Sequence, residues 1–383
     1  MKILKDISTI GFGDFVASGI AAAFWFYLAS LLTPADYGYV HYILSIGVLT
    51  STLTLLGTQN ILVVYIAKNK NIVKSLLNLS FFTGLVILLI CTFVFGKLDI
   101  GLLIFGITIF TYGISKNLAT KSFKKYSSYS ILQKSLTAIF GLICFYFFGV
   151  EGVVFGIALS YFVYLKLVLE DLKISRQTFT ELKSHYSELK SNKNFILNNY
   201  FLMITNSVTT QVDKIIIVPF LGLALLGNYS LSLQIIIILT AVPGIIFKFV
   251  LPHTIGGQVS KNLKRNTILL SFGFTFIGVV IAPLLIPIFF SEYNDVINII
   301  QIMSFSVIPI TINLFYFAKF LSIENGRIPL YGGILSSSIM TVGMISLGSL
   351  FGAQGIAVTH VMSYSSLCLF SYIMNKKISG TNL

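Results

Sequence analysis

Residues 8–32 read STIGFGDFVASGIAAAFWFYLASLL, a run of apolar and small residues that carries a single charge, Asp14. At about 1.5 Å per residue, a helix of this length crosses the roughly 30 Å of hydrocarbon in a bilayer. The run is longer than the apolar core of a signal peptide, which spans about 7 to 15 residues. We therefore expect it to remain in the protein as a first membrane-spanning helix.

Similar apolar runs follow along the whole chain of 383 residues, which is 56% hydrophobic and only 10% charged. Soluble domains carry roughly a quarter of charged residues, so water is not the solvent of this protein. The fold class predicted is an all-α polytopic membrane protein of about twelve transmembrane helices. We expect the spans at 8–32, 39–66, 75–95, 100–115, 127–148, 152–169, 195–220, 228–252, 267–290, 296–319, 328–349 and 354–375.

The positive charges indicate how these spans are oriented. If the amino terminus is cytoplasmic, 21 of the 26 lysines and arginines fall in cytoplasmic loops, and only Lys97 falls in an outer loop. This bias is what the positive-inside rule requires. We therefore predict a multi-pass protein of the cell (cytoplasmic or inner) membrane with both termini in the cytoplasm. The net charge of +13 then reflects topology and contact with anionic membrane lipids, and no nucleic-acid partner is needed to explain it.

The longest hydrophilic gap divides the chain into two halves of six spans each. We expect an amino-terminal lobe at 1–170, a cytoplasmic linker at 171–194 and a carboxy-terminal lobe at 195–383. Apolar residues recur at helical spacing in the linker, and Thr178-x-x-Glu181 has the form of a capping box. An amphipathic helix on the inner membrane surface is favoured, and a plain solvated linker is the alternative.

The two halves resemble each other in sequence. Leu32-x-x-Ala35-x-x-Gly38 after the first span matches Leu221-x-x-Ala224-x-x-Gly227 after the seventh, at an offset of 189 residues. Because six is an even number of spans, the second half enters the membrane in the same orientation as the first. The repeat is therefore expected to be parallel, with a pseudo-two-fold axis along the membrane normal. Two six-helix lobes around a central cavity follow.

Several classes of function are disfavoured by missing motifs. The sequence has no P-loop, no H-E-x-x-H and no G-x-S-x-G, and its four histidines have no paired spacing. Cys91, Cys144 and Cys368 lie in apolar spans, where cysteine usually acts as a small hydrophobic residue. We therefore expect no cofactor, no metal and no enzymatic activity. Any transport is predicted to be uncoupled or driven by an ion gradient.

Ionisable residues inside the spans are candidates for function, because each costs about 2.5 to 3.5 kcal/mol at a helix centre. They are Asp14, Lys134, Asp213, Lys214, Lys248 and Lys319. The last two lie near helix ends, where a lysine reaches the interface with its long side chain. For the deeper Asp14, Asp213 and Lys214 we favour a place in the cavity, with a structural hydrogen bond or ion pair as the alternative. Lys134 stays open between the two.

Polar residues also form two stripes at helical spacing. One stripe comprises Asn199, Asn206, Thr210 and Asp213, and the other comprises Ser45, Thr52 and Gln59, with Asn60 beside it. Lys214 points about 100° away from the first stripe. Such stripes face either a wet cavity or a partner helix, and both alternatives stay open for the second stripe.

Together these stretches resemble a known family. The matching segments are Gly11-Phe12-Gly13-Asp14-Phe15, Leu32-Thr33-Pro34-Ala35-Asp36-Tyr37-Gly38, Leu56-Gly57-Thr58-Gln59-Asn60, Val212-Asp213-Lys214 and Leu226-Gly227-Asn228-Tyr229-Ser230-Leu231. The chain resembles the polysaccharide or O-antigen (Wzx-like) flippases of the multidrug/oligosaccharidyl-lipid/polysaccharide (MOP) exporter superfamily.

The resemblance implies a MATE/MOP-like, V-shaped bundle of two lobes that opens alternately to either side. Its substrate would be a polyprenyl-(pyro)phosphate-linked oligosaccharide carried to the outer leaflet for surface polysaccharide biosynthesis. Polysaccharide polymerases and glycosyltransferases are candidate partners. The implied roles are phosphate binding for Lys214 and Lys134, contact with sugar hydroxyls for Asn206, Thr210, Gln59 and Asn60, and binding of a coupling H⁺ or Na⁺ for Asp14 or Asp213.

The arginines depart from this family's pattern. Flippases of this type tend to have cavity arginines, whereas Arg176, Arg265 and Arg327 all lie in predicted cytoplasmic loops. Lysine supplies a point charge without the bidentate grip on phosphate. The departure leaves room for an ion-coupled drug exporter of the same superfamily, which would hold a cationic substrate at Asp14 or Asp213. A membrane-embedded polysaccharide ligase is less favoured, because it would need a larger outer loop.

Overall fold

The computed structural model describes residues 2–55, 66, 72–94, 96–174, 193–255, 261–323 and 327–380. Within these ranges every regular element is helical and no strand occurs, which confirms the predicted all-α class. The helices are α1 (Lys2–Leu31), α2 (Pro34–Thr54), α4 (Ile72–Phe93), α5 (Leu98–Ala119), α6 (Phe123–Ser160), η1 (Tyr161–Tyr164), α7 (Leu165–Ile174), α9 (Lys193–Leu221), α10 (Leu223–Ile255), α11 (Lys261–Phe276), η2 (Ile277–Ile281), α12 (Ala282–Phe289), α13 (Val296–Met303), η3 (Ser304–Ser306), α14 (Val307–Ser322) and α15 (Arg327–Gly380).

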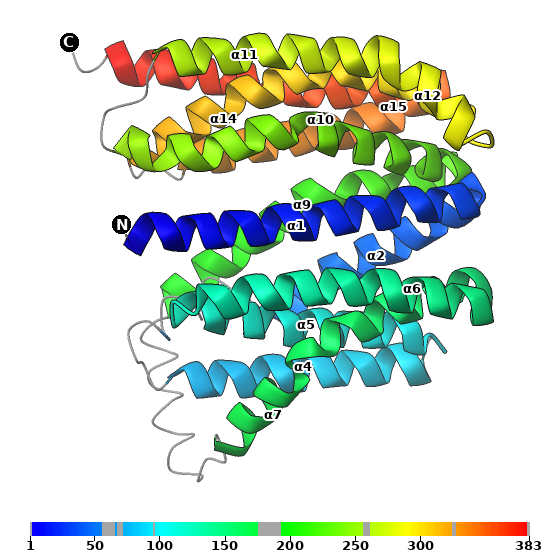
Figure 1. Ribbon diagram of the computed structural model, residues 1–383, viewed down its shortest axis with the longest axis vertical. Coiled ribbons are helices and arrows are strands. Elements are labelled where there is room, and N and C mark those ends of the chain that lie inside the picture. The colour runs from blue at the N-terminus through cyan, green and yellow to red at the C-terminus, as the bar shows by residue number, and fades with distance from the viewer. Residues whose placement is uncertain are drawn as a thin grey trace. The chain divides into compact units, whose positions relative to one another are not determined.

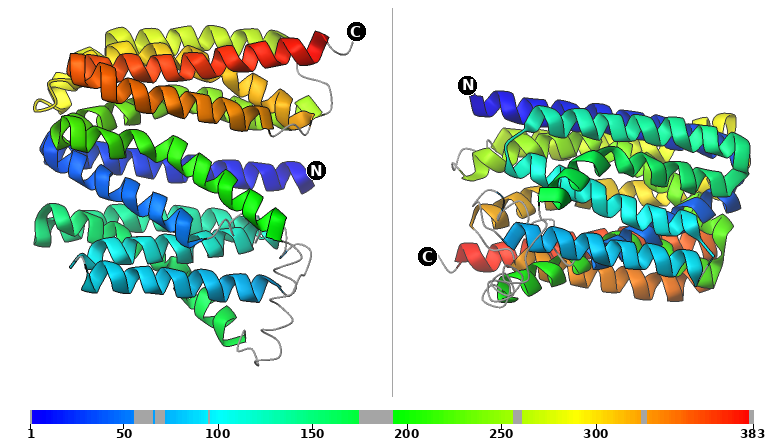
Figure 2. Two further views of the ribbon diagram at one scale, coloured as in Figure 1. Left: turned by 180° about the vertical axis from the view of Figure 1, so that it is seen from behind. Right: turned by 90° about the horizontal axis from the view of Figure 1, so that it is seen from below.

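The chain forms two compact units. Unit 1 comprises Met1–Trp25 and Ile43–Ser207, and unit 2 comprises Phe26–Tyr42 and Val208–Leu383, so that α1, α2 and α9 each contribute residues to both. In unit 2, α10, α11, α14 and α15 run side by side along much of their length (Figures 1 and 2). The division into lobes at 1–170 and 195–383 stays a prediction.

Two of the helices reverse direction at a glycine. Gly149 in α6 has φ 64° and ψ −148°, and Gly352 in α15 has φ 57° and ψ −128°, a region open essentially to glycine alone. After Gly149 the chain runs back along itself. The evidence is that a Cβ added at Gly152 or at Gly156 would overlap main-chain atoms of the preceding arm. Helix α6 is therefore an antiparallel pair of helices.

The same construction recurs in α15. Gly355 lies against the carbonyl oxygen of Leu347, so that α15 is a second tight hairpin. Both reversals carry the pattern Phe-Gly-x-x-Gly, at 148–152 and at 351–355. This second similarity between the halves was not predicted, and the close approach of two backbones explains why both positions need glycine.

Eight helical stretches of the described residues are long and apolar enough to cross a membrane, and the two hairpins, within Phe123–Leu172 and Arg327–Ile378, count once each among them. The chain is thus a multi-pass membrane protein. Helix α9 is long enough but is interrupted by polar residues and is not one of the eight. The total of twelve spans and the cytoplasmic position of the termini stay predictions.

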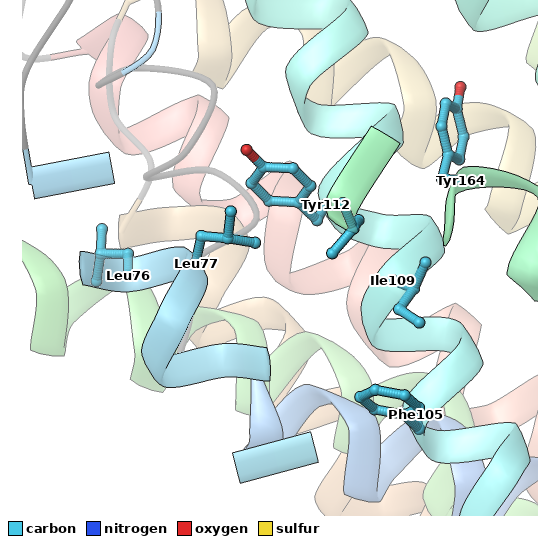
Figure 3. Close-up of a cluster of buried hydrophobic side chains, with 7 residues drawn as sticks. Leu76, Leu77, Phe105, Ile109, Tyr112 and Tyr164 are labelled. Carbon is cyan, nitrogen blue, oxygen red and sulfur yellow. The ribbon is translucent and has the colours of Figure 1, made fainter. Parts of the chain in front are cut away.

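Unit 1 has an apolar core between α4, α5 and the turn at η1. Leu76 and Leu77 of α4 pack near Phe105 and Tyr112 of α5, with Tyr164 of η1 in the same cluster (Figure 3). These side chains are at most 7% exposed. Because they are large and apolar, their burial fixes the short 3₁₀ turn against α5.

A polar contact then fixes α7 beyond that core. Asp171 of α7 accepts a hydrogen bond from the hydroxyl of Tyr112 at 2.8 Å, and the ammonium of Lys116 lies 2.6 Å from the same carboxylate oxygen. Residues 171–174, the start of the predicted linker, form the end of α7. The remainder of the predicted amphipathic helix, 175–192, lies outside the described residues.

In unit 2, α2 begins with a well-formed cap. The main-chain N–H of Asp36 donates to Oγ1 of Thr33 at 3.2 Å, and Pro34 occupies the first helical position, where a missing N–H costs nothing. Tyr293, in the turn before α13, donates its hydroxyl to the carbonyl oxygen of Leu32 at 3.0 Å. Burial, aided by the nearby carboxylates, raises the pKa of Tyr293, which keeps this donor protonated.

Candidate functional site

The most buried ionisable residue among the predicted site residues that the structure describes is Asp213 on α9, at 7% exposure. Tyr229 of α10, which is completely buried, donates its hydroxyl to Oδ2 of Asp213 at 2.8 Å. The main-chain N–H of Lys214 donates to Oδ1, also at 2.8 Å. A buried carboxylate is costly without such donors, so these bonds are what allows it inside an apolar bundle.

Lys214 brings a positive charge to the same carboxylate. Its ammonium nitrogen lies 3.9 Å from Oδ1 of Asp213, 3.1 Å from the carbonyl oxygen of Thr210 and 3.3 Å from Oε1 of Gln211. All three acceptors belong to α9 itself. The side chain of Lys214 is 17% exposed, so its neighbours do not enclose it completely. Although neighbouring residues on a helix point about 100° apart, the long lysine side chain reaches back to the aspartate.

Helix α15 adds two titratable side chains to this cluster. The ring of His360, which is 2% exposed, lies 6.3 Å from the ring of Tyr229 and 4.8 Å from that of Tyr364. Nδ1 of His360 has no hydrogen-bond partner among the described residues. Tyr364 is close enough to interact electrostatically with Asp213. We call Asp213, Lys214, Tyr229, His360 and Tyr364 the unit 2 cluster.

Sequence reasoning missed three members of the unit 2 cluster. Tyr229 belongs to a segment that supports the family resemblance but was given no role, and His360 was set aside because no second histidine follows at a useful spacing. The available signal was burial, since a histidine within a predicted span has to find a polar neighbour. Which neighbour it finds depends on the packing of α15 against α10, and this is a tertiary contact.

Unit 1 holds the other carboxylate. Asp14 on α1 is half-buried and accepts a hydrogen bond from the hydroxyl of Tyr126 on α6 at 3.2 Å. The two helices approach closely here, because Gly13 lies against the side chain of Ser127 and Ser127 donates to the carbonyl oxygen of Thr9 at 2.9 Å. Asp14 is thus held at a helix–helix crossing.

The remaining predicted ligands occupy different environments. Lys134 on α6 is half-buried and makes no hydrogen bond or ion pair within the described part of the chain. Asn206 and Thr210 on α9 are exposed, whereas Asp213 on the same predicted stripe is buried. Gln59 and Asn60 lie outside the described residues.

The polar stripe of the second helix bonds to another helix where the structure describes it. Ser45 is 1% exposed, and Thr52 donates its hydroxyl to Ser207 of α9 at 3.0 Å. Of the two alternatives for this stripe, the described portion favours helix pairing over a wet cavity.

The chemistry of these groups is that of ion and proton binding. The described residues contain no group of three or more histidine, cysteine, aspartate or glutamate side chains that could hold a metal ion. They do offer carboxylates, ammonium groups, phenols and an imidazole that lie within or near hydrogen-bonding distance of one another. These groups bind anions and cations and accept protons.

Comparison with known proteins identifies the fold. No family model and no curated protein matches the sequence. Among solved structures, an inward-facing multidrug resistance MATE transporter of the MOP superfamily matches with a TM-score of 0.69 at 13% identity, covering 95% of this chain and 94% of its own. The lipid II flippase MurJ, in an inward closed conformation, matches with a TM-score of 0.64 at 14% identity, covering 96% and 87%. The chain has the MOP transporter fold.

A MOP transporter from Pyrococcus furiosus is also similar, with a TM-score of 0.61 at 13% identity over 99% of this chain and 96% of that one. At such low identity the likeness establishes the MOP fold and no more. Within this MOP fold, each of the two carboxylates predicted as ion-coupling residues is bound by a tyrosine hydroxyl from a neighbouring helix, Asp14 by Tyr126 and Asp213 by Tyr229. The two pairs were not predicted as pairs.

Proposed function

We propose that this protein moves a polyprenyl-(pyro)phosphate-linked oligosaccharide from the inner to the outer leaflet by alternating access, as a step in surface polysaccharide biosynthesis. The observation that carries the proposal is Lys134. It lies on α6, seven residues or about 10 Å inside the predicted span 127–148, and has no acidic partner among the described residues. A cation at such depth is costly unless an anion joins it, and a pyrophosphate headgroup is such an anion.

Lys214 supports the same substrate class. Its side chain is 17% exposed, and its ammonium is held only by groups of its own helix, so that an arriving phosphate oxygen can take their place. Lys134 and Lys214 are the proposed phosphate ligands. The exposed Asn206 and Thr210, together with Gln59 and Asn60, are the proposed partners of sugar hydroxyls.

The fold is compatible with this proposal. One solved structure with the same fold is a lipid II flippase, and in the Pyrococcus furiosus transporter a binding pocket of reverse polarity suggests a different function. Here the spans contain lysines as well as carboxylates, which suits an anionic headgroup accompanied by a coupling ion at Asp14 or Asp213.

A second candidate is an ion-coupled exporter of cationic small molecules. The half-buried carboxylate of Asp14, with a tyrosine hydroxyl beside it, favours this alternative, because a carboxylate and an aromatic ring together attract organic cations. The multidrug MATE transporters among the similar structures are compatible with it.

The proposal also includes a site of action. In this proposal the protein lies in the cell membrane with both termini in the cytoplasm. Glycosyltransferases supply the substrate on the cytoplasmic side, and a polysaccharide polymerase takes up the product on the other side. These partners follow from the proposed substrate.

The test combines depletion in the host with reconstitution. Depletion should trap the lipid-linked intermediate in the cytoplasmic leaflet and reduce surface polysaccharide. Proteoliposomes should translocate a fluorescent polyprenyl pyrophosphate sugar, and Lys134→Ala and Lys214→Ala should each reduce the rate at least tenfold. Lys319→Ala is the matched control, since this lysine lies in the last turn of α14. If depletion leaves the intermediate and the polysaccharide unchanged but sensitises cells to cationic toxins, the exporter alternative replaces the flippase.

A further inference from the structure

The ammonium of Lys214 contacts two hydrogen-bond acceptors and one carboxylate, all on its own helix. An ammonium group has three N–H donors and no acceptor. The carbonyl oxygen of Thr210, Oε1 of Gln211 and Oδ1 of Asp213 lie at 3.1, 3.3 and 3.9 Å. Of these only Asp213 is charged. The ammonium is therefore balanced within α9, and an incoming anion has to compete with Asp213 for it.

Asp213 in turn depends on Lys214. The aspartate is 7% exposed, and apart from Tyr229 at Oδ2 its described partners are the ammonium and the main-chain N–H of Lys214. In a surrounding of low dielectric, burying a charged carboxylate costs free energy, and its counter-charge offsets this cost. A carboxylate that loses its counter-charge is most easily neutralised by taking up a proton. The hydroxyl of Tyr229 can then serve as acceptor for the new O–H.

We infer that a phosphate headgroup and Asp213 compete for Lys214, so that binding of the headgroup is accompanied by uptake of one proton at Asp213. The inference rests on the proposed function, because it takes the pyrophosphate of a lipid-linked sugar as the anion. It identifies the ion at this site as H⁺ rather than Na⁺. A sodium ion on Asp213 would have to share the carboxylate with the ammonium of Lys214, which lies 3.9 Å from Oδ1 and would repel it.

Other titratable groups surround the pair and have to be distinguished from Asp213. They are Tyr229 on α10, His360 and Tyr364 on α15, and His41 on α2, which lies within electrostatic reach of Lys214. His360 is one competitor for the proton, since its Nδ1 has no partner in the described part of the chain. Only a substitution of Asp213 separates these possibilities.

The energetic consequence is reciprocal. If the headgroup promotes protonation of Asp213, protons promote binding of the headgroup by the same factor. The affinity for a phosphate diester should then rise as the pH falls, by up to about tenfold per pH unit for one proton. Neutralising Asp213 permanently should remove this dependence and leave Lys214 free for the anion.

The experiment measures binding of a short-chain polyprenyl pyrophosphate sugar to the full-length protein in phosphatidylcholine nanodiscs from pH 6 to pH 8.5. This probe is a pyrophosphate diester, so its own charge is constant over the range. For the wild type we expect affinity to rise several-fold towards pH 6, with uptake of about one proton per ligand in weakly buffered solution. Asp213→Asn should bind with a pH-independent affinity at least equal to that of the wild type at pH 6.

Controls separate the site from its surroundings. Lys214→Gln should abolish the pH-dependent binding, and Glu292→Gln, an exposed carboxylate of unit 2, should leave it unchanged. Adding phosphatidylglycerol to the nanodiscs distinguishes the two sources of phosphate. If it suppresses the signal at equal concentrations of headgroup, the site belongs to a membrane phospholipid and the inference about the sugar substrate is overturned.

The outcomes discriminate between the two proposals. Binding that is independent of pH and releases or takes up no proton overturns the inference and leaves the proposed function standing. An Asp213→Asn variant that keeps the wild-type pH dependence assigns the proton to another group, such as His360, and also overturns it. Absence of binding at every pH overturns the proposed function together with the inference. Even if the Asp213 variant fails to fold, a wild type that takes up no proton on binding overturns the inference.

Discussion

Gly38 and Gly227 lie against each other's helix where α2 and α10 begin. A Cβ on Gly38 would overlap the carbonyl oxygen of Leu223, and a Cβ on Gly227 would overlap that of Pro34. The two glycines are the last residues of the repeated pattern Leu-x-x-Ala-x-x-Gly at 32–38 and 221–227. The pattern shared by the halves therefore has a direct structural reason, namely that each copy admits the backbone of the other.

Replacing either of these glycines should destabilise the protein. Gly38→Ala and Gly227→Ala each force a methyl group into a main-chain carbonyl, which costs about 1 to 3 kcal/mol or more. We expect a lower Tm in detergent, followed by fluorescence of the purified protein. Gly244→Ala, also on α10, is the control, because nothing lies within 4 Å of its Cβ position. It should leave the Tm unchanged or raise it slightly. Equal effects of all three would contradict the close crossing.

Replacing the glycines at the two chain reversals should also destabilise the protein, but for a different reason. Gly149→Ala and Gly352→Ala meet no neighbouring atom, but both place an alanine at positive φ with strongly negative ψ. Such strain costs of order 1 to 3 kcal/mol. The Tm should fall although no packing is altered. Gly333→Ala, an unconstrained glycine within α15, should have no such effect. If Gly149→Ala and Gly333→Ala behave alike, the chain does not reverse at residue 149.

The hydroxyl of Tyr229 should stabilise the buried carboxylate. Tyr229→Phe removes the donor to Oδ2 of Asp213 without changing the ring, and a lost hydrogen bond to a charged group costs about 1.5 to 3 kcal/mol. We expect a fall in Tm together with impaired transport. The double variant with Asp213→Asn should lose less than the sum of the single changes, because the two groups interact. Tyr372→Phe removes an exposed hydroxyl and serves as the control.

The contact between α5 and α7 should contribute more to the free energy of unfolding than a surface ion pair does. Lys116 and Asp171 are 30% and 19% exposed and are joined by the hydroxyl of Tyr112. A double-mutant cycle with Lys116→Met and Asp171→Asn should give a coupling energy of about 0.5 to 3 kcal/mol.

Lys97 and Glu151 provide the comparison for that cycle. They are also paired, at 3.0 Å, but are 43% and 69% exposed, and exposed pairs contribute about 0 to 1 kcal/mol. Equal coupling energies for both pairs, measured by unfolding in detergent, would show that the position of α7 does not depend on Asp171.

Cysteine labelling tests the orientation predicted from charge. Lys97 precedes α5 and Lys125 lies in the first turn of α6, on the other side of α5. In a background without Cys91, Cys144 and Cys368, a membrane-impermeant maleimide should label Lys97→Cys in intact cells and Lys125→Cys only after permeabilisation. The reverse pattern would place both termini outside and invert the proposed direction of transport.

The amino-acid sequence by itself determined the solvent of the protein and the class of its fold. Apolar runs such as 8–32 are long enough to span a bilayer, and this property requires no tertiary contact. The repeat at Gly38 and Gly227 was also visible, because a close approach of backbones demands glycine at fixed positions. Asp14, Asp213 and Lys214 were recognisable for the same kind of local reason, since charge in an apolar run is costly wherever it occurs.

Only the tertiary structure decided what those charges contact. Nothing in α9 indicates that the donor to Asp213 is Tyr229, sixteen residues away on α10, or that His360 of α15 lies beside that tyrosine. Likewise, Asn206 and Thr210 share a predicted stripe with Asp213, yet they are exposed and Asp213 is buried. Helical periodicity fixes the direction of a side chain around its own axis. What occupies that direction depends on the packing of other helices, and this depends on residues far away in the chain.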